Sequence, residues 1–133
     1  MANEAICIEA PRIIKRRTIG GAIAKGTVLY FSADPNTAAA SSAADQSFAG
    51  IAIEEVTAAD YALGRTEVSA AMDGVWDMKA TAAAITLGVA VAIGGANLIV
   101  AADAADILNG AWLGYAEETG ANDEVQRVRL KGF

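Results

Sequence analysis

Two stretches of the chain decide the fold: KGTVLYFSADPNTAAASSAADQSFAGIAIEE, from Lys25 to Glu55, and LGVAVAIGGANLIVAADAADILNGAWLGYAEE, from Leu87 to Glu118. They align at a nearly constant offset, with small shifts where turns differ in length. The matched positions are Gly26 and Gly88, Asn36 and Asn97, Asp45 and Asp106, Gly50 and Gly114, and the pairs Glu54-Glu55 and Glu117-Glu118. We infer that one β-rich unit is used twice.

Each unit alternates short apolar or β-branched runs with turn residues, a pattern typical of strands. We expect strands at 27–32, 37–40, 49–55 and 66–72 in the first copy, and at 89–93, 98–101, 112–118 and 124–131 in the second. The turn at Asp73-Gly74 extends the closing strand of the first copy, and an Ala/Asp segment at 101–108 predicts a short helix. These elements predict a mainly β fold, a compact sandwich or barrel-like domain of two related repeats with one or two short helices.

The domain organisation follows from the length of 133 residues, which suits one domain. We predict a single domain over 1–133, in which 1–24 form an N-terminal arm or first strand, 25–79 the first repeat and 87–133 the second. Alanine is abundant and large aromatic side chains are few, so an oligomer interface is expected to add stability.

One segment, GGAIAKGT from Gly20 to Thr27, contains the residue types of a phosphate-binding loop. The order is wrong, because such a loop ends in Gly-Lys-Ser/Thr at the start of a helix. Here the order is Lys25-Gly26-Thr27, and a strand-like run follows. The matching glycine, Gly88, has neither the lysine nor the threonine beside it. Gly26 is therefore interpreted as a turn residue, not as part of a nucleotide site.

The chain is poor in groups for catalysis. It has no histidine and one cysteine, so the commonest general base and metal ligand is missing. Cys7 cannot form an internal disulfide, and its place in the alternating run AICIE predicts a buried strand cysteine. No enzyme activity and no cofactor are predicted.

Acidic residues offer no convincing site either. Neighbours such as Glu54 and Glu55 point to opposite faces of a strand, so they do not converge on one substrate atom. Four aspartates have acidic spacing but lack the dense oxygen-ligand loop of a calcium site. These residues are Asp73, Asp77, Asp103 and Asp106, and we assign no metal to them.

An uncharged run at 80–102 is long enough to cross a bilayer. Glycines and Asn97 interrupt it, and VAVAI alternates with a period of two, so it predicts a strand, a turn and a second strand. The N-terminus does not read as a signal peptide, because Glu4 and Glu9 interrupt the apolar residues. No membrane partner is expected.

The N-terminal arm, AICIEAPRIIKRR, combines apolar and cationic residues although the net charge is −6. Pro11 disfavours a helix and suits an extended strand. Two interpretations stay open: a docking arm that pairs with another chain, and a plain first strand of the fold. A nucleic-acid partner is not expected, since the acidic body would repel phosphates and no aromatic platform is present. The candidate contact residues are Ile6, Ile8, Arg12, Ile13, Ile14, Lys15, Arg16 and Arg17.

A series of motifs along nearly the whole chain resembles the small capsid decoration, or cement, proteins of tailed bacteriophages, the DUF2190-type group. The most specific are DGVWDM in mid-chain and the ending VQRVRLKG. The others are IEAPRII, AKGTVLYF, FAGIAIEE, LGVAVAI and WLGYAEE.

This resemblance implies a role like that of lambda-type head decoration proteins. It implies a homotrimer on the outer surface of the expanded capsid, located in the virion and in the host cytoplasm before assembly. The implied partner is the major capsid protein, contacted by the N-terminal arm, and the implied function is to cement the shell. The alternative is another phage structural β-module, from a tail, baseplate or surface layer, without a cementing role.

Overall fold

A computed structural model describes residues 3–81 and 83–132. In this part of the chain short strands predominate and two short helices occur, which confirms the predicted mainly β fold. The elements are β1 (Ile6–Glu9), β2 (Ile14–Thr18), β3 (Val28–Ala33), β4 (Thr37–Ala40), β5 (Phe48–Ala52), α1 (Ala58–Ala62), β6 (Glu67–Ala71), β7 (Val75–Ala80), β8 (Ala90–Gly95), β9 (Leu98–Ala101), α2 (Ala104–Leu108), β10 (Trp112–Ala116) and β11 (Val125–Leu130).

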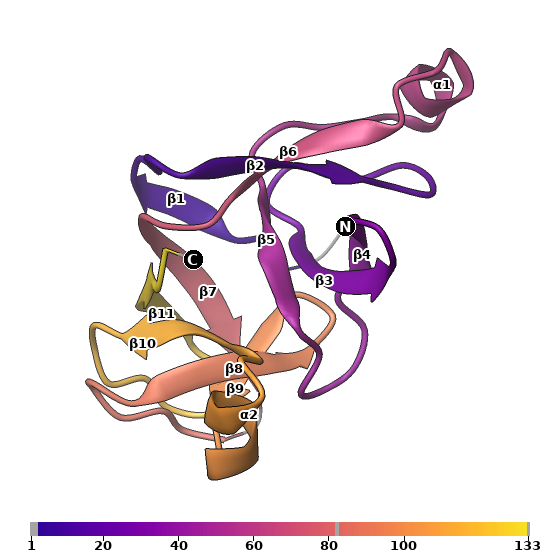
Figure 1. Ribbon diagram of the computed structural model, residues 1–133. Helices are drawn as coiled ribbons and strands as arrows, with labels where there is room; N and C mark the ends of the chain where they lie inside the picture. Colours follow the sequence, from indigo (N-terminus) through magenta and orange to yellow (C-terminus); the bar gives the residue numbers. More distant parts are fainter. Residues whose placement is uncertain (1–2, 82, 133) are drawn as a thin grey trace.

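The strands form two barrels (Figure 1). The N-terminal barrel is closed in the order β2-β4-β3-β5-β6. The C-terminal barrel has the order β7-β11-β10-β8-β9 and is closed by pairing of β7 with β9, while β1 is added outside β7. In each barrel the first strand is parallel to the third and antiparallel to the fifth. The predicted two-repeat architecture is confirmed by this shared topology.

The residues at which each barrel begins and ends differ from the predicted bounds of the two repeats, 25–79 and 87–133. We expected the strand after Asp73-Gly74 to extend the first copy, but β7 pairs with β11 in the C-terminal barrel. The N-terminal barrel instead begins with β2, within the segment 1–24 that was expected to be an arm or first strand. The turn at Gly74, with φ +95°, carries the chain from one barrel to the other and does not form a hairpin.

The matched turn residues share one backbone conformation. Gly26 and Gly88 have φ values of +86° and +85°, and Asn36 and Asn97 have +50° and +57°. This left-handed region is open to glycine and tolerated by asparagine. Gly26 and Gly88 are therefore turn residues ahead of β3 and β8, as their alignment predicted.

The core consists of two clusters of buried side chains. One lies within the N-terminal barrel and includes Leu29, Val68 and several alanines, which suit a narrow interior. The other fills the C-terminal barrel and also takes Val28 and Ile51 from the N-terminal barrel. Strands β3 and β5 thus contribute to both clusters, so the contact between the barrels is part of the core.

The uncharged run at 80–102 forms β8 and β9, which pair antiparallel as predicted. Neither described helix has the length and apolar character needed to cross a membrane. The predicted helix is present as α2, which starts at Ala104 because Asp103 is extended and caps it.

Helix α1 is the second of the one or two short helices expected, but its position was not predicted. It lies beyond the N-terminal end of β6 and has no fully buried residue, although Tyr61 packs against the core of the N-terminal barrel (Figure 1). It therefore has no apolar stripe to signal it. A capping box between Thr57 and Asp60 defines its start.

Candidate contact surface

The N-terminal segment is folded and does not form a free arm. Strand β1 pairs antiparallel with β7, so that Cys7 faces Trp76. Strand β2 pairs antiparallel with β6. The loop between β1 and β2 is held by the Asp73 carboxylate, which accepts hydrogen bonds from the backbone N–H groups of Arg12 (2.7 Å) and Ile13 (2.8 Å). Of the two interpretations, the plain first strand of the fold therefore fits this segment, whose β2 is the first strand of the N-terminal barrel. A contact role for the segment stays a prediction.

Large apolar side chains are exposed along this segment. The exposed fractions are 64% for Ile6, 40% for Ile8, 38% for Ile13 and 48% for Ile14. All residues of β1 are exposed because this strand lies at the end of its sheet. A run of exposed isoleucines on an edge strand is a typical contact surface.

The expectation of a buried cysteine was wrong. Cys7 lies in a strand, but it is exposed, since β1 is covered on only one edge. Its partial desolvation raises the pKa of the thiol, and the charge of Lys25 opposes this shift. The side chain is accessible to a thiol reagent.

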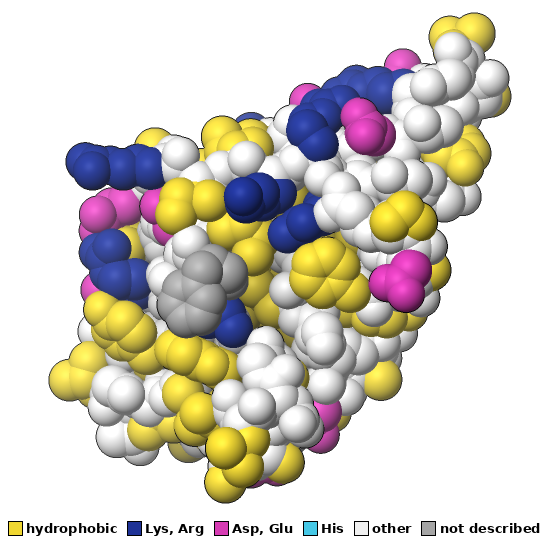
Figure 2. Space-filling model, viewed as in Figure 1, with side chains coloured by type: hydrophobic (Ala, Val, Ile, Leu, Met, Phe, Trp, Pro, Cys, Tyr) yellow, Lys and Arg dark blue, Asp and Glu magenta, His cyan; other side chains and the backbone are white. Residues whose placement is uncertain are grey.

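Beside Cys7 lies an apolar groove with a volume of about 800 Å³. Figure 2 shows hydrophobic side chains at the surface between dark-blue Lys and Arg side chains on the side that carries β1 and β2. The residues that line the groove are Glu4, Ala5, Ile6, Cys7, Pro11, Ile14, Lys25, Gly26, Ile53 and Trp76. We call it the β1–β2 groove.

One wall of the β1–β2 groove depends on Gly26. The backbone N–H of Ala5 donates to the Gly26 carbonyl at 2.8 Å. A side chain at position 26 would place its Cβ 2.6 Å from the Ala5 carbonyl oxygen. Only glycine allows the N-terminal segment to lie this close.

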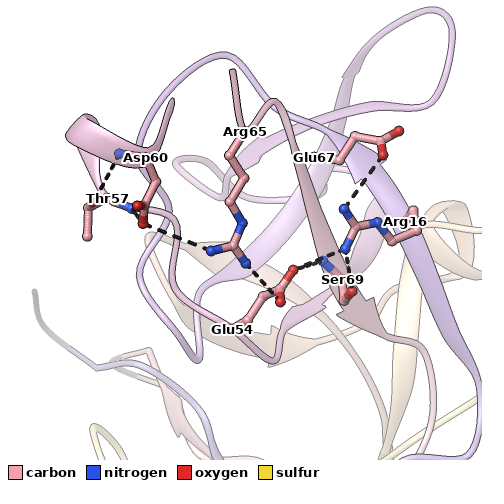
Figure 3. A network of polar contacts seen from close by, with 7 residues as sticks. All are labelled: Arg16, Glu54, Thr57, Asp60, Arg65, Glu67 and Ser69. Atoms are coloured by element: carbon pink, nitrogen blue, oxygen red, sulfur yellow. Dashed lines mark hydrogen bonds and ion pairs between the residues drawn. The ribbon is translucent and has the colours of Figure 1, made fainter. Parts of the chain in front are cut away.

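Arg16, one of the predicted contact residues, belongs to a network of ion pairs on the N-terminal barrel (Figure 3). Its guanidinium lies 3.2 Å from the Glu54 carboxylate and 3.6 Å from that of Glu67. Glu54 also pairs with Arg65 at 2.9 Å and accepts a hydrogen bond from the backbone N–H of Ser69. This backbone hydrogen bond is the main cause that lowers the pKa of Glu54. The network ties β2 to β6 and to the segment before α1.

Arg17 is also engaged within the barrel. It donates to the Ala49 carbonyl (2.9 Å) and to Asn36 (2.6 Å), and lies 4.7 Å from the centre of the Phe31 ring. Burial lowers the pKa of this guanidinium. Arg16 and Arg17 therefore stabilise the fold, which leaves other cations for a partner.

Three cations of the N-terminal segment and the groove wall have no ion pair among residues 3–81 and 83–132: Arg12 and Lys15 in the N-terminal segment, and Lys25 in the groove wall. Arg12 and Lys15 belong to the predicted contact set, as do Ile6 and Ile14 in the groove wall. The sequence did not point to Lys25, Ile53 or Trp76, which reach the groove only through the pairing of distant strands. No local signal marks them.

The aspartates with acidic spacing do not come together as a set. Asp77 pairs with Arg127 at 3.6 Å, and Asp73 holds the loop described above. Asp103 and Asp106 form the capping box of α2, where Asp45 joins them within 4.8 Å. Burial is the main cause that raises the pKa of Asp106, and the neighbouring carboxylates add to it. These contacts give the aspartates structural roles.

Comparisons with known proteins bear on the fold. No protein-family model matches the chain, and no curated protein is similar to it in sequence. Among solved structures, the chain is similar to the head fiber gp8.5 N base in bacteriophage phi29, with a TM-score of 0.54 and 16% identity. The similarity covers 90% of this chain and 93% of that chain. The likeness is one of fold along nearly all of both chains, and the DUF2190-type resemblance stays a prediction.

Proposed function

We propose that this chain is a structural protein of a bacteriophage head. The observation that carries this proposal is the similarity of fold to the base of a phage head fiber over nearly the whole chain. The motif resemblance to capsid decoration proteins points to the same class independently. We further propose that the protein has no enzymatic activity and acts by binding.

More specifically, we propose a homotrimer that binds the major capsid protein on the outer surface of the expanded shell. The exposed isoleucines of β1 and β2 supply an apolar contact surface on a protein whose net charge is otherwise negative. A protein that binds the mature lattice more tightly than separated subunits stabilises that lattice by mass action. Cementing needs only this difference in affinity.

The test is sedimentation of purified protein with expanded shells and with precursor shells of the phage that carries this gene. We expect saturable binding to expanded shells at a fixed ratio, weaker binding to precursor shells, and a light-scattering mass of a trimer. Bound shells should also resist heating better than bare shells. Binding to tails or baseplates instead would favour the alternative structural module.

Deletion of the N-terminal segment would not be informative, because β2 pairs along its length with β6 in the N-terminal barrel. Loss of binding could then reflect loss of the fold. Substitutions of exposed side chains are the appropriate perturbation.

A further inference from the structure

The two barrels differ at one equivalent edge. In the C-terminal barrel, β7 has β11 on one edge, while the other edge is shared by β1, at Val75 to Asp77, and β9, at Lys79 and Ala80. In the N-terminal barrel, β2 takes the place of β7 and has β6 on one edge. In the described part of the chain, the other edge meets β4 only at Thr18.

Within residues 3–81 and 83–132, the edge of β2 from Ile14 to Arg16 therefore has no strand where the equivalent edge of β7 is covered by β1. Within this stretch, the Arg16 carbonyl is already occupied, since it accepts a hydrogen bond from the Asn36 side-chain amide at 2.7 Å. The β1–β2 groove lies along the uncovered part, since Ile14 forms its wall together with Ile6 and Pro11. An uncovered strand edge beside an apolar groove is suited to the addition of a strand.

We propose that the β1–β2 groove binds an extended apolar segment of the capsid shell protein, which carries a carboxylate and adds as a strand to the free edge of β2. This inference rests on the proposed function. The direction of donation follows from the fold: β1 and β2 are already paired in their own sheets, so this chain accepts the strand and the shell supplies it.

The chemistry of the occupant follows from β1, which fills the equivalent position on the other barrel. Its sequence, Ile-Cys-Ile-Glu, runs antiparallel to β7, and Glu9 at its end lies 3.4 Å from the Arg129 guanidinium. At the groove, Lys25 and Glu4 lie in the wall, and Lys25 has no ion pair among the described residues. By analogy with Glu9 of β1, which pairs with Arg129, the unpaired Lys25 favours a strand with an acidic side chain.

The groove is also continuous with the surface proposed to meet the shell. Ile6 and Ile14 belong to both, and they are 64% and 48% exposed. Covering them with an apolar strand would remove Ile6, the more exposed of the two β1 isoleucines, from water, which favours binding. The same contact would protect the edge of β2 from unwanted pairing.

A matched pair of variants tests the proposal. Ile14→Asp places a charge in the groove, and Ile107→Asp places the same charge on α2, which does not line it; the two isoleucines are 48% and 49% exposed. We expect Ile14→Asp to weaken binding to expanded shells about tenfold or more, since both apolar burial and strand addition suffer. Ile107→Asp should bind like the wild type, and both should keep the wild-type circular dichroism spectrum.

Cys7 provides a second measurement on the wild-type protein, because it lines the groove and is the only cysteine of the chain. We expect alkylation by N-ethylmaleimide to be rapid in the free protein and strongly slowed on expanded shells. This readout decides the matter even if Ile14→Asp fails to fold.

Three results would count against the groove. Unchanged shell binding by folded Ile14→Asp, or undiminished alkylation of Cys7 on shells, overturns strand addition while the proposed function stands. Slow alkylation in the free trimer would show that a second copy fills the groove, which also overturns it. If wild-type protein fails to bind shells at all, the proposed function itself fails.

Discussion

Alanine substitutions at Gly26 and Gly88 separate two effects that a single glycine variant would combine. Both residues have left-handed backbone geometry, with φ values of +86° and +85°. Among the described residues, no atom beyond the chain neighbours of Gly88 lies within 4 Å of an added Cβ, whereas at Gly26 the Ala5 carbonyl oxygen lies 2.6 Å from it. The pair thus compares backbone strain alone with the same strain plus a close contact.

The expected magnitudes differ by a factor of about three. A left-handed alanine costs about 1–2 kcal/mol, and its lower entropy in the unfolded chain offsets about 0.4–1 kcal/mol of this. Gly88→Ala should therefore lower the free energy of unfolding by about 1 kcal/mol. In Gly26→Ala the Ala5 segment must also move away. This costs about 1 kcal/mol for its hydrogen bond to Gly26 and about 1 kcal/mol for the exposed Ala5 methyl, or about 3 kcal/mol in all.

Urea unfolding followed by tryptophan fluorescence measures the difference. With a slope of about 2 kcal/mol per molar urea, a gap of about 2 kcal/mol separates the two midpoints by about 1 M. Alkylation of Cys7 should also be faster in Gly26→Ala than in Gly88→Ala, since β1 follows directly after Ala5. Equal midpoints for the two variants would refute the role assigned to the close contact.

Two further predictions concern polar groups in the interior. Burial and the nearby carboxylates raise the pKa of Asp106, so its contribution to stability is fully present below the ordinary value of 3.8 and is lost as the pH rises through the folded-state pKa. Asp106→Asn should therefore have a higher melting temperature than the wild type at pH 7. This gain should shrink toward pH 4, because the wild-type carboxylate then becomes protonated and uncharged. A lower melting temperature of the variant at pH 7 would contradict this. The buried Asn97 carbonyl oxygen accepts a hydrogen bond from the Val28 N–H at 2.8 Å, so Asn97→Ala should cost about 1–3 kcal/mol for that unpaired donor beyond the shared backbone strain. Asn36→Ala, at a turn of the same geometry, is the comparison in urea unfolding: it loses hydrogen bonds with Arg16 and Arg17, but both are solvent-exposed and water can replace them, so its loss should be smaller. An equal loss in both variants would contradict the role of the buried bond.

Only part of the candidate contact surface could be predicted from the sequence. The apolar and cationic residues at 6–17 are adjacent in the chain, so their composition alone indicated a contact segment. Which cations remain available could not be predicted, because Arg16 and Arg17 find partners such as Glu54 and Asn36 that are far away in the sequence. The groove was also out of reach, since the pairing of β1 with β7 brings Trp76 beside Cys7.

The sequence by itself determined the β-rich unit, its duplication and its turns. These depend on local preferences: alternation of apolar residues selects strands, and glycine or asparagine at matched positions supplies left-handed turns. Only the tertiary structure decided which strand joins which barrel. The Asp73-Gly74 turn has the local form of a hairpin, yet β6 and β7 lie in different sheets because β2 and β11 offer them partners. Strand pairing is a long-range choice made by packing, and no short stretch of sequence contains it.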